Sequence, residues 1–202
     1  RCLILCRDVS SRYTRRNETE YRKIAAYIHA AASAKAGNYM AFFPSYRLME
    51  DVLSVYRSEF AGENVEILVQ GTGMTEVQRE EFLGKFQEKN DRSLVGFCVM
   101  GGIFSEGIDL AGEKLIGAVV IGTGIPQIGQ ERELLKEFYD KKGENGFDYA
   151  YRFPGMNKVL QSAGRVIRTR EDVGVILLLD DRFCTREYEM LFPREWADRT
   201  TA

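Results

Sequence analysis

The sequence predicts an α/β fold with a parallel sheet of about six strands and helices on both faces. Strand-like and helix-like segments alternate along most of the 202 residues, as they do in chains built from βαβ units. The strand-like segments are nearly continuous apolar runs, which is typical of strands that are covered on both faces. With 45% hydrophobic residues, the chain can bury one full core, so we expect a single domain over residues 1–202.

Six apolar segments have the length of a strand. The first of them opens the chain, and the last runs directly into Asp180, Asp181 and Arg182. The predicted strands cover residues 2–6, 39–43, 65–70, 94–100, 116–122 and 174–180.

Helix start signals precede three of the segments between these strands. Asn17 and Glu20 have the spacing of a capping box, in which each residue satisfies a backbone N–H of the other. Thr75 and Gln78 repeat this spacing, and Ser45 precedes a segment with apolar residues at helical intervals. We therefore expect a helix after each of these three positions.

Residues 123–150 are more polar and charged than the rest of the chain. Lys141, Lys142, Gly143 and Gly146 give this stretch a weak structural pattern. We expect a polar surface excursion from the sheet here.

Charge and hydropathy argue against a strongly basic nucleic-acid-coating protein and against a membrane protein. The formal net charge is −2, from 28 basic and 30 acidic residues, so any contact with nucleic acid must come from a local basic patch. The longest apolar runs have only strand length, and the chain opens at Arg1 without a signal-peptide pattern. We expect no membrane association and a cytoplasmic location.

The four cysteines do not have the spacing of a metal site. Cys2 and Cys6 are near each other, whereas Cys98 and Cys184 stand far apart, so we expect free thiols and no bound metal. His29 is the only histidine and lies in an alanine-rich segment, where we expect it to pack rather than catalyse.

An arginine-rich segment, QSAGRVIRTR, covers residues 161–170. On a helix, Gln161, Arg165 and Arg168 would project from one face. Two guanidinium groups one turn apart can hold a phosphate in bidentate contacts, and Gln161 adds a neutral donor and acceptor beside them. The alternative is a solvated surface, which is the common fate of an Arg-rich helix face.

A glycine-rich segment, GGIFSEGIDL, covers residues 101–110 and follows a predicted buried strand. Parallel α/β sheets bind ligands at the carboxyl ends of their strands, which is where these residues fall. Gly102 and Gly107 allow a ligand to approach the backbone closely, and Ser105, Glu106 and Asp109 supply a hydroxyl and two carboxylates. The alternative is an ordinary turn.

A third segment, NYMAFFPSY, covers residues 38–46 and runs from an apolar strand to a helix start. A free hydroxyl and unpaired N–H groups at a helix start suit a phosphate, so Ser45 is a candidate for backbone contact. Tyr46 can stack on a base. Taken alone, an ordinary N-cap and a packing tyrosine are the simpler interpretation.

The three segments together resemble motifs IV, V and VI of superfamily 2 helicases, in the order in which the family carries them. The string GGIFSEGID is similar to motif V of helicases related to bacterial DinG and to the xeroderma pigmentosum group D protein, and the resemblance extends over residues 38–183. It implies the second RecA-like domain of such a DNA helicase.

The resemblance assigns roles to individual residues. Arg165 and Arg168 would be arginine fingers for ATP bound with Mg²⁺ by a neighbouring domain, and Gln161, Glu106, Gly107 and Asp109 would serve the nucleotide side of the site. The residues expected to grip single-stranded DNA are Ser45, Tyr46, Gly102 and Ser105. Related helicases carry an iron–sulfur cluster in their first motor domain, so we expect no cluster in this chain.

No G-x-x-x-x-G-K-[ST] loop occurs in the sequence, so the chain lacks the phosphate cradle and lysine of a P-loop enzyme. The resemblance therefore implies half of an ATPase site, inactive alone, with the N-terminal helicase domain of the same polypeptide as its partner.

Two alternatives remain open. The chain can be a non-catalytic RecA-like module that binds nucleic acid or protein, in which case no Walker loop would precede it. A sugar- or dinucleotide-dependent transferase would need a nucleotide fingerprint after the first strand, where Arg7, Asp8 and Ser10 stand instead.

Overall fold

A seven-stranded, fully parallel sheet forms the centre of the molecule. The computed structural model describes residues 2–60, 62, 64–88, 92–104, 110, 114–166 and 173–202. The strands are ordered β3-β4-β2-β5-β6-β1-β7 across the sheet, and all six strand pairs run parallel. Their bounds are β1 (Cys2–Cys6), β2 (Asn38–Phe43), β3 (Val65–Val69), β4 (Ser93–Val99), β5 (Gly117–Ile121), β6 (Val175–Leu179) and β7 (Thr200–Thr201).

The six predicted strands are confirmed with ends that differ by at most one residue, and β7 is an addition. β7 is a two-residue edge strand beside β1, held by Ala202 N donating to Leu5 O at 2.8 Å. It contains no apolar run, which is why the hydrophobic pattern did not predict it.

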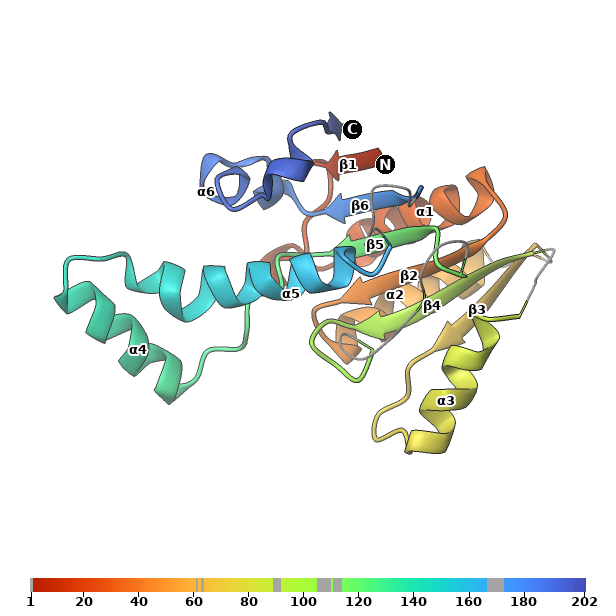
Figure 1. Cartoon of the computed structure of the whole chain (residues 1–202), viewed down its shortest axis with the longest axis horizontal. Coiled ribbons are helices and arrows are strands. Elements are labelled where there is room, and N and C mark those ends of the chain that lie inside the picture. The colour runs from red at the N-terminus through yellow and green to blue at the C-terminus, as the bar shows by residue number, and fades with distance from the viewer. Residues whose placement is uncertain are drawn as a thin grey trace.

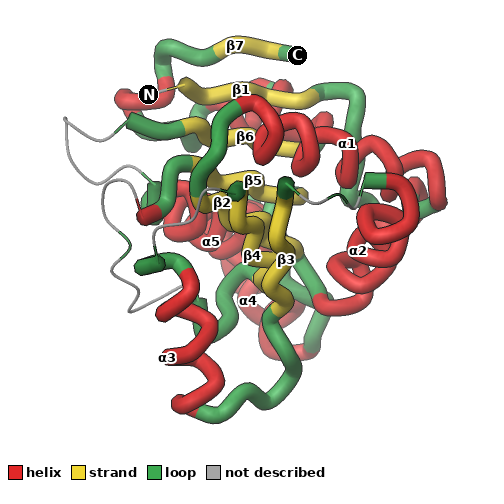
Figure 2. Tube along the Cα trace, turned by 90° about the vertical axis from the view of Figure 1, so that its right-hand side faces the viewer, coloured by secondary structure: helices red, strands yellow, loops and turns green. Residues whose placement is uncertain are grey.

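Helices cover both faces of the sheet, as the sequence predicts. Figure 2 shows α1 and α2 on one side and α3 and α5 on the other. The longer helices are α1 (Glu18–Ala34), α2 (Tyr46–Glu59), α3 (Glu76–Lys85), α4 (Gln130–Lys141) and α5 (Phe153–Ala163), and the short ones are η1 (Tyr13–Arg15), η3 (Asp148–Arg152), η4 (Asp181–Cys184), α6 (Arg186–Glu189) and η5 (Arg194–Trp196).

The core has two layers, one on each face of the sheet. Successive strand side chains point to opposite faces, so Phe42 packs in the layer with α5 and the neighbouring Phe43 packs in the layer with α1 and α2. All six residues of β2 are buried. Both faces of these strands pack against helices, which is why their apolar runs in the sequence are continuous.

The three predicted helix starts are present, but their caps differ. Ser45 Oγ accepts from Leu48 N at 3.3 Å, and Thr75 and Gln78 form a complete capping box. Asn17 caps α1, but the Glu20 carboxylate accepts from Ser10 N at 2.9 Å instead of returning to the cap. The expected box at α1 is thus a single cap, because a loop contact takes the second half.

The excursion at residues 123–150 contains helix α4, which the weak pattern there did not predict. Figure 1 shows α4 and the start of α5 extending away from the sheet. None of the twelve described residues of α4 is buried. α4 is held to η3, which leads into α5, by the stacked rings of Tyr139 and Tyr149, whose centroids lie 3.8 Å apart, and by Arg132 donating to Ala150 O at 2.8 Å.

His29 packs between α1 and α2, where its ring contacts Tyr56 and Phe60. Cys6 and Cys98 are buried, Cys2 is exposed and Cys184 is half-buried. Within the described ranges, no helix is both long enough and apolar enough to cross a membrane.

Candidate functional site

The loops that follow the strands meet at one edge of the sheet, because all strands are parallel. β4 lies between β3 and β2 in the sheet, so the loops after these three strands are neighbours. Ser45 and Tyr46 follow β2, Gln70 follows β3, and Gly102 follows β4. The structure thus brings together the predicted nucleic-acid residues that it describes.

A hydrogen-bonded chain ties these three loops to one another. Gln70 Oε1 accepts from Val99 N at 2.9 Å, and Gln70 Nε2 donates to Tyr46 Oη at 2.8 Å. The Tyr46 hydroxyl in turn donates to Gly71 O at 3.3 Å. Because both of its hydroxyl roles are used, the half-buried Tyr46 ring is held in one orientation.

Gln70 is the residue in this group that sequence reasoning missed. It was placed at the end of a predicted strand, and only 3% of it is exposed. The signal was available: a buried polar side chain at the carboxyl end of an apolar run needs partners, and here they are the neighbouring loops. Gly102 allows this contact, because a Cβ there would lie 3.0 Å from Gln70 Nε2.

Helix α5 ends earlier than the sequence analysis expected. Its last residue is Ala163 and Gly164 is the C-cap, so Gln161 lies in the last turn while Arg165 lies in the turn beyond it. Arg165 therefore follows the helix instead of lying on it. Arg168 lies outside the described residues, so the predicted common face of the three side chains stays a prediction.

Gln161 is exposed and Arg165 is half-buried at this carboxyl end of α5. The remaining predicted site residues lie outside the described residues, and their roles stay predictions: Ser105, Glu106, Gly107, Asp109 and Arg168.

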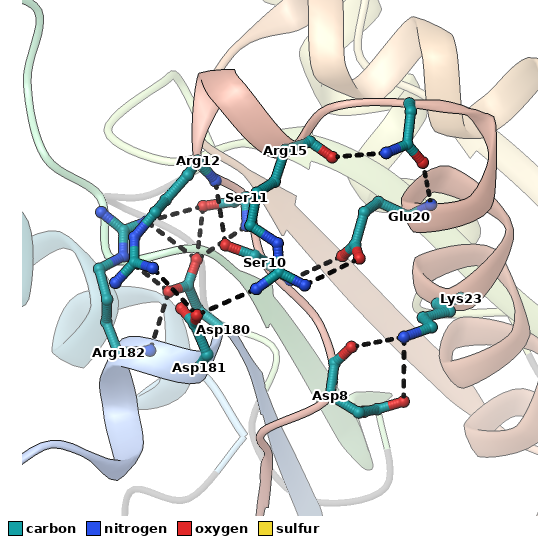
Figure 3. A network of polar contacts seen from close by, with 11 residues as sticks. Asp8, Ser10, Ser11, Arg12, Arg15, Glu20, Lys23, Asp180, Asp181 and Arg182 are labelled. Atoms are coloured by element: carbon teal, nitrogen blue, oxygen red, sulfur yellow. Dashed lines mark hydrogen bonds and ion pairs between the residues drawn. The ribbon is translucent and has the colours of Figure 1, made fainter.

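A second polar cluster lies where β6 and β1 end, and Figure 3 shows its members pointing toward one another. Asp180 is fully buried and its Oδ2 accepts from Ser11 N at 2.9 Å and from Ser11 Oγ at 2.7 Å. Arg182 Nε donates to Asp180 Oδ1 at 2.7 Å. Burial opposes ionisation of Asp180, but the bonds from Arg182 and Ser11 outweigh it and hold its pKa below the usual value.

The neighbouring Asp181 has the opposite environment. Burial and the charge of Asp180 raise the pKa of Asp181, although Arg12 and Arg15 contact its carboxylate at 3.1 and 3.3 Å. Arg15 also pairs with Glu20 at 3.2 Å. The two arginines are nearly half exposed, with 45% and 46% of their side chains accessible.

This second cluster fixes the loop after β1 through the bonds of Ser11 to Asp180. Asp180 and Arg182 neutralise each other, and no group of three or more potential ligands that could hold a metal ion occurs in the described part of the chain. Tyr13 lies on the same loop and is 77% exposed. The sequence analysis noted the strand ending in acidic residues but did not foresee their partners 169 positions away.

Comparison with known proteins identifies the family. Residues 28–199 match the family described as the helicase C-terminal domain. The chain is 32% identical over 151 residues to the ATP-dependent DNA helicase DinG of Photobacterium profundum, a match that covers 74% of this chain and 21% of that protein. It is 28% identical over 193 residues to the helicase subunit XPD/RAD3 of the general transcription and DNA repair factor IIH of Saccharomyces cerevisiae, with 90% and 24% covered.

The fold agrees with this match. A solved structure of apo XPD superimposes with a TM-score of 0.79 at 20% identity, covering 100% of this chain and 39% of that one. The sheet has the RecA-like arrangement expected from the sequence. The chain spans about a quarter of the length of the two curated relatives. The chain belongs to the helicase C-terminal domain family, in which it is similar to the DinG and XPD helicases.

Proposed function

We propose that this chain is the second motor domain of an ATP-dependent DNA helicase, which completes an ATP site on a companion domain and grips single-stranded DNA. The match of residues 28–199 to the helicase C-terminal domain family carries the proposal. The loops gathered at one edge of the parallel sheet support it, because ligands of such sheets bind there.

On the nucleotide side, the chain contributes the carboxyl end of α5. Arg165 and Arg168 act as arginine fingers on the γ-phosphate, and Gln161 adds its exposed amide from the last turn of the helix. Glu106, Gly107 and Asp109 complete the nucleotide side. Because the sequence contains no P-loop, the Mg²⁺-bound triphosphate has to be held by the companion RecA-like domain.

On the DNA side, the described loops have the donors that a phosphate backbone needs. Ser45 Oγ accepts from Leu48 N at 3.3 Å, which leaves its own proton to donate to a phosphate oxygen. Tyr46 is held in place by Gln70, so its ring can stack on a base without first losing rotational freedom. Gly102 and Ser105 provide the adjoining backbone and hydroxyl.

The coupling of the two sides follows from their place on one domain. Closure of the two motor domains around ATP moves the DNA-side loops together with the end of α5. Loops that hold the strand more tightly in one nucleotide state than in another then convert hydrolysis into movement.

The test is DNA-stimulated ATP hydrolysis with and without the companion domain. In the two-domain protein, Arg165→Ala and Arg168→Ala should each lower kcat by about 10³ to 10⁵, the usual contribution of an arginine finger. Arg57→Ala removes an exposed arginine from α2 and serves as the matched control. Rapid hydrolysis by residues 1–202 alone, or full activity of both finger variants, would contradict the proposal.

A further inference from the structure

Lys158 of α5 lies against the glycine loop that follows β4, and the packing of α5 places it there. Gly155 of α5 presses on the loop after β5: a Cβ on Gly155 would lie 2.6 Å from Thr123 O. Lys158 follows three residues later, on the same side of the helix. α5 is thus seated on this loop by backbone contact, and the position of Lys158 follows from it.

The Lys158 side chain extends from the loop after β5 to the loop after β4. A Cβ on Gly124 would lie 3.4 Å from Lys158 Cβ, and one on Gly101 would lie 3.2 Å from Lys158 Cε and 3.6 Å from its Nζ. Gly101 has a φ of +71°, a conformation that favours glycine. The bare backbone of Gly101 therefore supports the aliphatic stem and directs the ammonium group to the carboxyl edge of the sheet.

This ammonium group has no counter-ion within the described part of the chain. Among the described residues, Lys23, Lys85, Lys136 and Lys141 form ion pairs. Lys158, like Lys35 and Lys114, forms none with a described residue. Lys158 is also half-buried, so its stem is restrained by packing rather than free in solvent. A positive charge that is held in place at this edge of the sheet can attract an anion.

The described nucleic-acid residues lack the charge that Lys158 would supply. Ser45, Tyr46 and Gly102 are neutral, yet the affinity of proteins for nucleic acid comes chiefly from cations that replace counter-ions at phosphates. A lysine binds a phosphate oxyanion as a compact point charge and needs no bidentate geometry.

We propose that Lys158, supported by Gly101, is a binding residue for a phosphate oxyanion at the carboxyl edge of the sheet. The inference rests on the proposed function, since it adds a residue to the same interface. The phosphate belongs either to the backbone of the single strand or to the nucleotide, and both share the chemistry that Lys158 recognises.

The test compares Lys158→Met with Lys141→Met in the protein that contains both motor domains. Methionine keeps the stem that covers Gly101 and removes only the charge, and Lys141, 79% exposed at the end of α4, loses the same charge at a distance from the loops. Lys158→Arg, which retains the cation, should keep most of the binding. The readouts are anisotropy of a fluorescent dT oligonucleotide at a series of salt concentrations and the KM for ATP.

If the phosphate belongs to the strand, Lys158→Met makes the negative slope of log K against log salt shallower by about 0.7. Binding then weakens about fivefold at ~0.1 M salt relative to an unaffected reference at ~1 M. If it belongs to the nucleotide, DNA binding is unchanged and the KM for ATP rises. Wild-type levels of both quantities in Lys158→Met, in a protein that otherwise binds DNA and hydrolyses ATP, overturn the inference and leave the proposed function intact. A wild-type protein that neither binds DNA nor hydrolyses ATP overturns the proposed function itself.

Discussion

Replacing Asp180 by asparagine should remove much of the stability of the domain. Both Asp180 oxygens accept hydrogen bonds from donors, Ser11 and Arg182, so the NH₂ group of an asparagine would face another donor. Asp180 is 0% exposed and Arg182 18%, so the change also leaves a largely buried guanidinium without its charge partner. Breaking one side of a buried ion pair costs about 3–5 kcal/mol.

The neighbouring aspartate is the matched control. Asp181 is 24% exposed and its arginine partners are nearly half exposed, so its ion pairs contribute about 0–1 kcal/mol. Burial and the neighbouring charge of Asp180 raise its pKa, so removing its charge also relieves a repulsion. Asp181→Asn should therefore change the free energy of unfolding by less than about 1 kcal/mol in either direction.

Urea unfolding at pH 7, followed by circular dichroism, measures the difference. With a slope of about 2 kcal/mol per molar urea, Asp180→Asn should lower the midpoint by about 2 M. Ser11→Ala removes one bond to the buried carboxylate and costs about 1.5–3 kcal/mol, which keeps the test informative if Asp180→Asn does not fold. Equal midpoint shifts for the two aspartate variants would refute this reasoning.

The difference in stability between wild type and Asp180→Asn should depend on pH, and the lowered pKa of Asp180 fixes the sign of this dependence. The pKa of Asp180 is lowered in the folded state, so its stabilisation is present above the unfolded pKa, about 3.9, and is lost as the pH falls through the folded value. The stability gap between wild type and Asp180→Asn should thus be full at pH 7 and narrow well below pH ~4. A gap that stays constant down to the acid transition would contradict the assignment.

Three further predictions concern packing and loop order. Gln70→Leu should weaken DNA binding and lower stability by about 1–3 kcal/mol, because it removes the partner of the partly buried Val99 N–H; unchanged affinity at unchanged stability would contradict this contact between the loops. Gly96→Ala should cost about 1–3 kcal/mol, since its Cβ would lie 2.9 Å from Phe86 Cζ; a neutral effect in thermal unfolding would show that α3 shifts freely. Burial raises the pKa of the Cys6 thiol to about 12 and also raises the pKa of the Cys98 thiol, so both should resist alkylation at pH 8 until the protein is unfolded. Rapid labelling detected by mass spectrometry would contradict the burial.

Local patterns predicted most of the secondary structure because burial on two faces leaves a strong hydrophobic signal. The β2 and β4 runs were found nearly to the residue for this reason. Helix α4 was not predicted because it buries none of its residues: its few apolar side chains, Leu134, Leu135 and Phe138, are exposed among many charged ones. The early end of α5 at Ala163 escaped because the hydrophobic spacing continues past Gly164.

The sequence predicted which residues of the candidate site follow each strand, but not which residues from different strands contact one another. Ser45 and Gly102 could be placed at the carboxyl edge from the segments that precede them. The partners of Gln70 and Asp180 could not, because they depend on the order of strands in the sheet, and that order is not written in any single segment.

The order of the strands in the sheet also affects how this domain folds during its synthesis. β1 lies between β6 and β7, and the bond from Ser11 to Asp180 joins positions 169 residues apart. During synthesis on the ribosome, an apolar strand that emerges first must wait for its neighbours until nearly all of the domain has left the exit tunnel. Folding should therefore slow at this step, because the contact between β1 and β6 spans so much of the chain.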